Sequence, residues 1–220
     1  GNANFGDRDK KTTEETIFGI GSITKQFTAA TLIKLWDEDL TKGKTSGTEV
    51  SEIFPQGIDT NLSNFMTSLQ ERFPQSSDQF DKIQADESYS EITLRDLLSH
   101  THGLGGANLK ESFNLVRTTG ERPLELYEVI NTTEKMRDET GEVSDQYGKW
   151  RYSNFGFDLA AMIIETITEK PFDEVVRDKV LKPNGLNSTH PQIDNVELYA
   201  SNPNVARGYI IDDNKPRLEE

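Results

Sequence analysis

The chain has 220 residues, of which 33% are hydrophobic and 28% are charged, and its formal net charge is -14. This composition is typical of a globular protein, and no stretch approaches the roughly 18 consecutive apolar residues that a transmembrane helix needs. The acidic excess disfavours nucleic acid as a partner, because proteins that bind phosphate backbones carry clusters of Lys and Arg. The chain has no cysteine, which excludes disulfides, thiolate zinc sites and a cysteine nucleophile.

The first residues predict little regular structure before a long helix. Residues 1–21 are expected to hold a strand end, a polar turn and a short extended run from Ile17 to Gly21, without the basic start and apolar run of a signal peptide. From Ser22 to Glu38 apolar residues leave little polar surface, which predicts a helix enclosed on most sides. We therefore expect this helix to lie inside the fold.

The middle of the chain is more polar. Between Thr41 and Ser90 glycines and prolines interrupt any long periodic element, which predicts a loop-rich excursion with a short helix at about 64–72. Thr93 is expected to cap a helix that runs to His100 and is ended by the glycines after it. Further helices are predicted at 123–136, 157–168 and 172–180.

Ser22 and Lys25 are the first candidates for catalysis. Residues three apart on a helix share a face, so the Lys25 amine can reach the Ser22 hydroxyl. Burial favours a neutral, basic lysine, and the free N–H groups of a helix start stabilise developing negative charge, which together activate a weak nucleophile. The alternative is an N-cap serine beside a surface lysine. The glycine-rich run before Ser22 and the apolar helix after it favour catalysis.

Tyr152 and Asn154 are the second candidate pair. They stand in the run Trp150-Arg151-Tyr152-Ser153-Asn154, just ahead of an apolar helix. Side chains two residues apart in an extended segment point the same way. A tyrosine so placed can pass a proton to a leaving group, and an asparagine can hold a substrate amide. The alternative is a simple helix lead-in with Asn154 as the cap.

These segments resemble the serine β-lactamases of class C, and the D-alanyl-D-alanine carboxypeptidases and esterases that share their fold. The stretch from Phe18 to Ala30 looks like the family's nucleophile segment, and the stretch from Ile92 to Leu104 is similar to its next helix and turn. Tyr152-Ser153-Asn154 matches the family's tyrosine-x-asparagine element. The resemblance also touches residues 184–189 and 206–209, and so covers most of the chain.

The resemblance implies an α+β fold of the β-lactamase/transpeptidase type, here mainly its helical region with only stubs of the antiparallel sheet region. Residues 1–21 would be a remnant of the sheet region, 22–200 the helical region, and 201–220 the start of a truncated return to the sheet. A polar insertion at about 55–90 would account for an interval between the two candidate pairs that is longer than the family leads us to expect. We favour a tolerated surface insertion over one that reshapes the substrate cleft.

The resemblance also implies a serine hydrolase without a metal or organic cofactor. Ser22 would be the nucleophile and half of the oxyanion hole through its N–H, Lys25 the proton acceptor, Tyr152 the proton shuttle and Asn154 the substrate anchor. A β-lactam, a D-Ala-D-Ala peptide or a small ester would acylate Ser22, and water would release the product. The resemblance suggests a periplasmic or secreted location and leaves the oligomeric state open.

The family's third element, a Lys or His followed by Thr or Ser and then Gly, is missing from the sequence. The nearest approach, Lys44-Thr45-Ser46-Gly47, has an extra residue and lies far too early. We therefore expect the 220-residue chain to be inactive by itself, and a noncatalytic binding or regulatory protein that retains the fold stays open as an alternative. A Ser-His-Asp hydrolase is disfavoured, because Ser22 lacks the Gly-x-Ser-x-Gly elbow.

The pair His100 and His102 invites a metal interpretation. His190 is the only other histidine and cysteine is absent, so a full set of zinc ligands is hard to assemble from these residue types. We expect the two histidines to stabilise the turn that follows the helix at 92–100.

Overall fold

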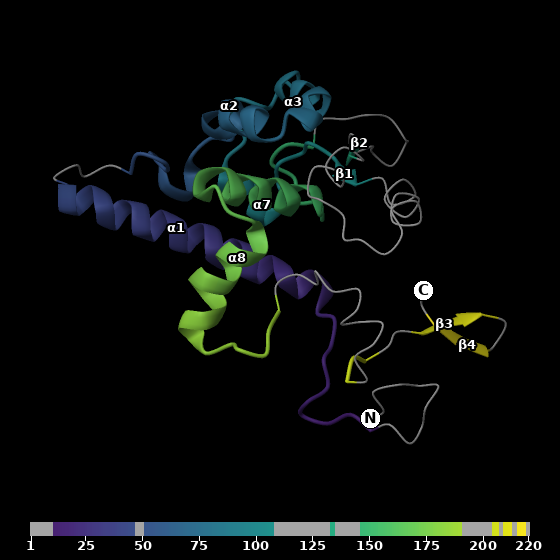
Figure 1. The fold of residues 1–220 in the computed structure, drawn as a ribbon. Coiled ribbons are helices and arrows are strands. Elements are labelled where there is room, and N and C mark those ends of the chain that lie inside the picture. Colours follow the sequence, from purple (N-terminus) through teal and green to yellow (C-terminus); the bar gives the residue numbers. More distant parts are fainter. Residues whose placement is uncertain are drawn as a thin grey trace. The chain divides into compact units, whose positions relative to one another are not determined.

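The computed structural model describes residues 11–46, 51–107, 133–134, 146–190, 204–206, 209–212 and 215–218. The chain divides into two compact units, one made of Gly1–Thr24 with Ile193–Glu220 and the other of Lys25–Gln192. Figure 1 labels the helices and strands of both. Among the residues described, no helix is long and apolar enough to cross a membrane.

Helices dominate the second unit. The α-helices are α1 (Thr24–Ser46), α2 (Ser63–Arg72), α3 (Ser77–Gln84), α4 (Leu94–Ser99), α7 (Phe155–Thr168) and α8 (Phe172–Val176), and α8 continues into a π-helical turn at Arg177–Leu181. Short 3-10 turns of this unit lie at Gly57–Asp59, Pro74–Ser76 and Lys182–Asn184, and another lies at Gly21–Ile23 in the first unit. Two short strands, β1 (Gly106–Ala107) and β2 (Thr133–Glu134), pair in antiparallel fashion.

The first unit holds short pieces of sheet. β3 (Tyr209–Asp212) and β4 (Lys215–Leu218) form an antiparallel hairpin. A parallel bridge joins Ile17 to Val205, and the Ile17 N–H donates to the Asn204 carbonyl at 2.9 Å. These pieces fit the expected stubs of a sheet region at the two ends of the chain.

α7 is the centre of the core in the second unit. Its residues are buried without a break from Leu159 to Ile164, so the helix is enclosed on every side there. Helices α2, α4 and α8 pack against it, and Figure 1 shows it among the other helices of this unit. The predicted helix at 157–168 is confirmed, with its start two residues earlier.

α1 is longer and more exposed than the sequence predicts. Its buried positions recur three or four residues apart and so form a single stripe along the helix. They are Thr28, Thr31, Leu32 and Leu35. Ile33 is 47% exposed, and Ile23 just before the helix is 52% exposed. The prediction of a helix enclosed on most sides is therefore wrong: the apolar residues lie on more than one face, and the described residues cover only one of those faces.

The segment at 55–90 is mostly helical and supplies a large part of the core. The predicted short helix at 64–72 is confirmed as α2, whereas α3 was not predicted. Leu62, Leu69 and Phe80 have no exposed surface and belong to the same hydrophobic cluster as α7. The expectation of a loop-rich excursion is wrong, because a few apolar residues at helical spacing are enough to bury one face of two short helices.

α4 begins as predicted and ends earlier. Thr93 Oγ1 accepts from the Asp96 N–H at 3.2 Å, and the Asp96 carboxylate accepts from the Thr93 N–H at 3.0 Å, which is a complete capping box. The helix ends at Ser99, since His100 adopts a left-handed conformation with φ of 63°. The residue that stops the helix is thus His100 rather than the glycines after it.

Two further helix predictions have different outcomes. The helix predicted at 172–180 is confirmed as α8 and its π-helical turn. Of the helix predicted at 123–136, Thr133 and Glu134 form strand β2 instead, because they pair with β1. The remaining residues of that prediction lie outside the described part of the chain.

A close contact between Gly156 and His102 sets how the turn after α4 meets the start of α7. The His102 side chain is fully buried, and its Nδ1 accepts from the Leu104 N–H at 3.1 Å. A Cβ atom on Gly156 would lie 2.9 Å from the His102 ring and 2.8 Å from the Leu97 carbonyl oxygen. Only glycine fits here without displacing a neighbour, so this contact fixes where α7 starts.

We expect Gly156→Ala to destabilise the protein by about 1–3 kcal/mol, because overpacking at a backbone carbonyl outweighs the roughly 1 kcal/mol that alanine gains in a helix. Equilibrium unfolding in urea measures the difference. Combining it with His102→Ala should recover part of the loss relative to the sum of the single variants. An unfolding free energy at or above that of the wild type would contradict the close packing.

The burial of His102 predicts a pH-dependent stability. Burial, and then the nearby His100, lowers the pKa of His102 from 6.5 to about 4. The unfolded chain therefore binds more protons between pH 6.5 and 4, so stability is full above pH 6.5 and falls as the pH drops to 4, by about 3 kcal/mol from this group.

Unfolding of His102→Asn against the wild type isolates this contribution, since asparagine keeps an acceptor for the Leu104 N–H and cannot titrate. The difference in unfolding free energy between the two proteins should change by about 3 kcal/mol between pH 7 and 4. The matched control, His190→Asn at an exposed position, should leave the wild-type profile unchanged. A difference that is constant with pH would exclude a buried neutral His102.

Candidate active site

Three of the four predicted site residues lie together in the second unit. Lys25, in the first turn of α1, donates from Nζ to Asn154 Oδ1 at 2.7 Å. The Tyr152 hydroxyl donates to the same oxygen at 3.2 Å. Lys25 Nζ also lies 4.9 Å from the centre of the Tyr152 ring. An amine and a phenol thus converge on one amide oxygen, although Lys25 and Asn154 are 129 residues apart.

Asn154 stands at the N-cap position of α7 but does not cap the helix with its side chain. Its backbone is helical, with φ of -71° and ψ of -34°, and its carbonyl accepts from the Phe157 and Asp158 N–H groups. The side-chain amide is turned to Lys25 and Tyr152 instead. The interpretation of Asn154 as an ordinary helix cap is therefore wrong.

Ser22 lies in the 3-10 turn at Gly21–Ile23, which passes directly into α1. The Thr24 N–H donates to the carbonyls of Gly21 and Ser22 there, and the Ser22 residue is exposed. Ser22 belongs to the first compact unit, whereas the other three site residues belong to the second. The structure thus groups Lys25, Tyr152 and Asn154, and places Ser22 at the end of the segment that leads into α1.

His100 supports Tyr152, which the sequence did not predict. Its ring lies 4.7 Å from the Tyr152 ring and 5.2 Å from the Phe157 ring, centre to centre. Nδ1 accepts from the Ser153 N–H at 3.1 Å. Burial, followed by the positive charge of Lys25, lowers the pKa of His100, which keeps the imidazole neutral and able to accept this bond.

Ser153 ties the loop that carries both candidate residues to the turn after α4. It is buried, and its hydroxyl donates to the Gly105 carbonyl at 2.8 Å. The Arg151 N–H donates to the His100 carbonyl at 2.9 Å. Because the backbone is held on both sides of Tyr152, the phenol has a defined place above the His100 ring.

The two histidines of the turn act as the sequence predicts. His100 accepts from Ser153, and His102 accepts from Leu104. His102 Nε2 is buried and has no hydrogen-bond partner in the described part of the chain. Within that part, no group of three or more His, Cys, Asp or Glu side chains is placed to hold a metal ion.

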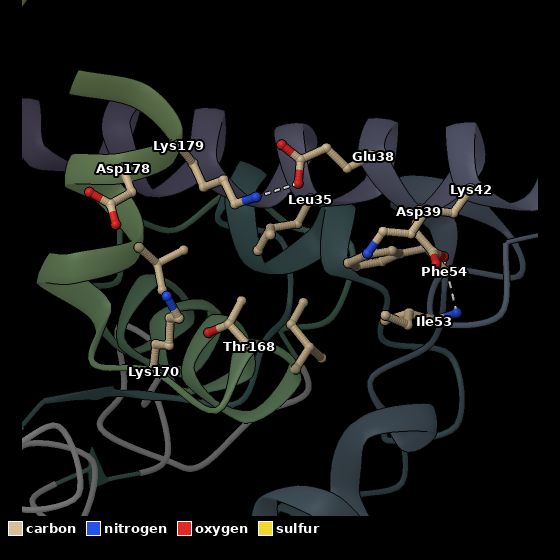
Figure 2. Close-up of a pocket in the computed structure, with 12 residues that line it drawn as sticks. Leu35, Glu38, Asp39, Lys42, Ile53, Phe54, Thr168, Lys170, Asp178 and Lys179 are labelled. Atoms are coloured by element: carbon tan, nitrogen blue, oxygen red, sulfur yellow. Dashed lines mark hydrogen bonds and ion pairs between the residues drawn. The ribbon is translucent and has the colours of Figure 1, made fainter. Parts of the chain in front are cut away.

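A cavity of about 310 Å³ lies elsewhere in the second unit, between α1, the segment at 53–54, the end of α7 and α8. Figure 2 shows its apolar residues, including Leu35 and Phe54, and the ion pair between Lys179 and Glu38 at 2.5 Å on its edge. None of the predicted site residues lines it. This cavity is therefore distinct from the cluster around Asn154.

Comparison with curated proteins finds two relatives that share part of their length with this chain. The unguisins hydrolase ungD' of Aspergillus campestris is 26% identical over 208 residues, which cover 94% of this chain and 33% of that protein. The putative penicillin-binding protein PbpX of Bacillus subtilis is 26% identical over 125 residues, which cover 56% of this chain and 27% of that protein. The chain spans about a third or less of these relatives.

Comparison with solved structures finds the same fold. The octameric penicillin-binding protein homologue from Pyrococcus abyssi matches with a TM-score of 0.63 and 26% identity over 99% of this chain and 41% of that chain. The penicillin binding protein from Bacillus halodurans matches with a TM-score of 0.61 over 99% of this chain and 56% of that chain, and at 19% identity it shows the fold alone.

The sequence profile described as Beta-lactamase matches residues 2–197, which is most of the chain. Together with the grouping of Lys25, Tyr152 and Asn154, this match confirms the family that the motifs indicate. The chain belongs to the Beta-lactamase family and has the β-lactamase/transpeptidase-like fold, of which the structure describes mainly the helical region.

Proposed function

We propose that this chain provides the catalytic serine, lysine and tyrosine of a serine hydrolase that transfers an acyl group to Ser22 and then to water. The observation that carries the proposal is the convergence of Lys25 Nζ and the Tyr152 hydroxyl on Asn154 Oδ1, at 2.7 Å and 3.2 Å. The substrates proposed are β-lactams, D-Ala-D-Ala peptides and small esters. The hydrolase and penicillin-binding names of the relatives support this class.

The acylation step uses each group once. Ser22 Oγ attacks the carbonyl carbon while its proton passes to the Lys25 amine, and the Ser22 N–H stabilises the negative charge on the substrate oxygen. The spacing of the two residues in the sequence supports this pairing, since residues three apart on a helix face the same way.

Protonation of the leaving group, and deprotonation of the water that later attacks the ester, need a second proton carrier. Tyr152 is 50% exposed and its hydroxyl shares the Asn154 oxygen with the Lys25 amine, so it can relay the proton to the departing nitrogen or oxygen. Water then attacks the Ser22 ester with the proton flow reversed. Asn154 Oδ1 is already used by Lys25 and Tyr152, which leaves its Nδ2 amide to donate to a substrate carbonyl.

The missing third element favours the noncatalytic alternative for a chain that lacks it. No Lys/His-Thr/Ser-Gly run stands within the 220 residues, so one side of the substrate site and the second oxyanion donor have no assigned residues. We propose that turnover requires this element. A chain without it would act as a noncatalytic binding or regulatory protein of the same fold.

Intact mass after incubation with penicillin or a chromogenic short-chain ester tests the proposal, in the 220-residue chain and in any longer product of its gene. We expect a covalent adduct in a product that contains the third element, and none in Ser22→Ala. Lys25→Ala should slow acylation by about 10²–10⁴-fold, the usual range for general bases. The matched control Ser63→Ala, at an exposed serine that starts α2, should acylate as the wild type does.

The outcomes separate the alternatives. An adduct that persists in Ser22→Ala would reject Ser22 as the nucleophile. Turnover by the 220-residue chain would reject the requirement for the third element. If no product of the gene forms an adduct or hydrolyses the ester, the noncatalytic alternative replaces the enzyme for these substrates.

A further inference from the structure

Trp150 is a large aromatic side chain beside the candidate site to which the mechanism gives no role. It is 68% exposed, more than any other large hydrophobic side chain in the described part of the chain. It stands two residues before Tyr152, which is itself 50% exposed. A single exposed apolar side chain is common on protein surfaces, whereas a group of them in contact with one another often marks a binding site.

Trp150 belongs to such a group. Its ring lies 6.1 Å from the His100 ring, centre to centre, at an angle of 84°. The His100 ring also contacts the Tyr152 ring, at 4.7 Å and an angle of 36°. Edge-to-face and tilted ring pairs at these separations are attractive, so the three rings hold one another in place. We call Trp150, His100 and Tyr152 the aromatic face.

The aromatic face begins at the candidate catalytic groups. Lys25 Nζ lies 4.9 Å from the centre of the Tyr152 ring, and the Tyr152 hydroxyl donates to Asn154 Oδ1 at 3.2 Å. A substrate whose carbonyl is held by the Asn154 amide therefore has Tyr152 next to it, followed by His100 and Trp150. A group attached beside that carbonyl can lie against these rings.

Hydrogen bonds fix the loop that carries the two exposed rings before any substrate binds. The Arg151 N–H donates to the His100 carbonyl at 2.9 Å, and the Ser153 hydroxyl donates to the Gly105 carbonyl at 2.8 Å. Tryptophan and tyrosine side chains also have only two rotatable χ angles each. Binding against this face therefore requires little ordering of the protein, and less of the contact energy is lost to entropy.

We propose that Trp150 is a specificity-determining residue, which binds an aromatic group that the substrate carries beside the carbonyl held by Asn154. The favoured class is an arylacetyl amide, such as a phenylacetyl group on an amine, over the corresponding acetyl amide. Ring contacts with Trp150 and His100 supply the preference. The selection among substrates rests on the proposed function, whereas binding of an aromatic amide to this face does not.

Binding is tested by NMR on the 220-residue chain, without any acylation. The chain has two tryptophans and so two indole N–H signals, of which that of Trp36, packed against the core, is an internal control. Phenylacetamide, titrated to its solubility limit, should shift the Trp150 indole signal and the Tyr152 ring signals and leave the Trp36 signal in place. Acetamide has the same amide without the ring and should shift neither indole signal. An unmoved Trp150 signal, or equal shifts with the two amides, would overturn the proposal.

Selectivity is measured in a gene product that acylates Ser22, with two penicillins that differ only in a phenylacetyl or an acetyl side chain. Trp150→Ala should lower the preference for the phenylacetyl compound about tenfold, mainly through weaker binding rather than a slower acylation step. Trp150→Phe keeps a flat ring and should retain most of the preference. The matched control Leu186→Ala, at another exposed apolar residue, should leave it unchanged. A merely structural role of Trp150 predicts an equal loss for both penicillins, and that result would contradict the proposal.

Failure of this proposal and failure of the proposed function give different results. A Trp150 signal that shifts with phenylacetamide, without a serine adduct in any product of the gene, would uphold the aromatic face and reject the proposed function. A Ser22 adduct that forms equally fast with both penicillins would uphold the function and reject the role of Trp150.

Discussion

The packing of Gly156 against His102 and the Leu97 carbonyl is the constraint on which the site depends. Here the turn after α4 and the first turn of α7 lie so close together that a Cβ atom on Gly156 would clash with its neighbours. The contact sets the start of α7, and Asn154 stands two residues before it. The loop that carries Tyr152 is then held by hydrogen bonds to His100 and Gly105. The position of the polar groups thus follows from the packing of two helices.

The polar groups of the candidate site are few, and they lie at the start of the apolar helix α7. From Leu159 to Ile164 every residue of α7 is buried, so a charge one turn further along would have no partner. Asn154 and Asp158 lie where α7 emerges from the core and where Lys25 of α1 reaches it. The Lys25 amine therefore donates to the Asn154 amide oxygen, and two aromatic rings lie within 6 Å of Nζ.

The sequence predicted those features whose signals are local. α7 follows from its apolar run, α2 from its helical spacing, and the start of α4 from the Thr93 cap. The clustering of Lys25, Tyr152 and Asn154 was anticipated from residue types and a resemblance. The exposure of α1 and the core role of α3 were not, because both depend on which other segments pack nearby. The contact of His100 with Tyr152 joins residues far apart in the sequence, and no local pattern indicates it.

His102 and Asp158 impose opposite pH dependences on the same small region. The fold prefers neutral His102, so its contribution to stability grows as the pH rises from 4 to 6.5. The fold also prefers protonated Asp158, so the contribution of Asp158 to stability shrinks as the pH rises from 3.8 through about 6. The two slopes oppose each other in stability, and above pH 6 the imidazole of His102 is neutral and the carboxylate of Asp158 is ionised. Above pH 6 the first turn of α7 therefore carries a negative charge, and as the pH falls Asp158 loses this charge before the His102 ring takes up a proton.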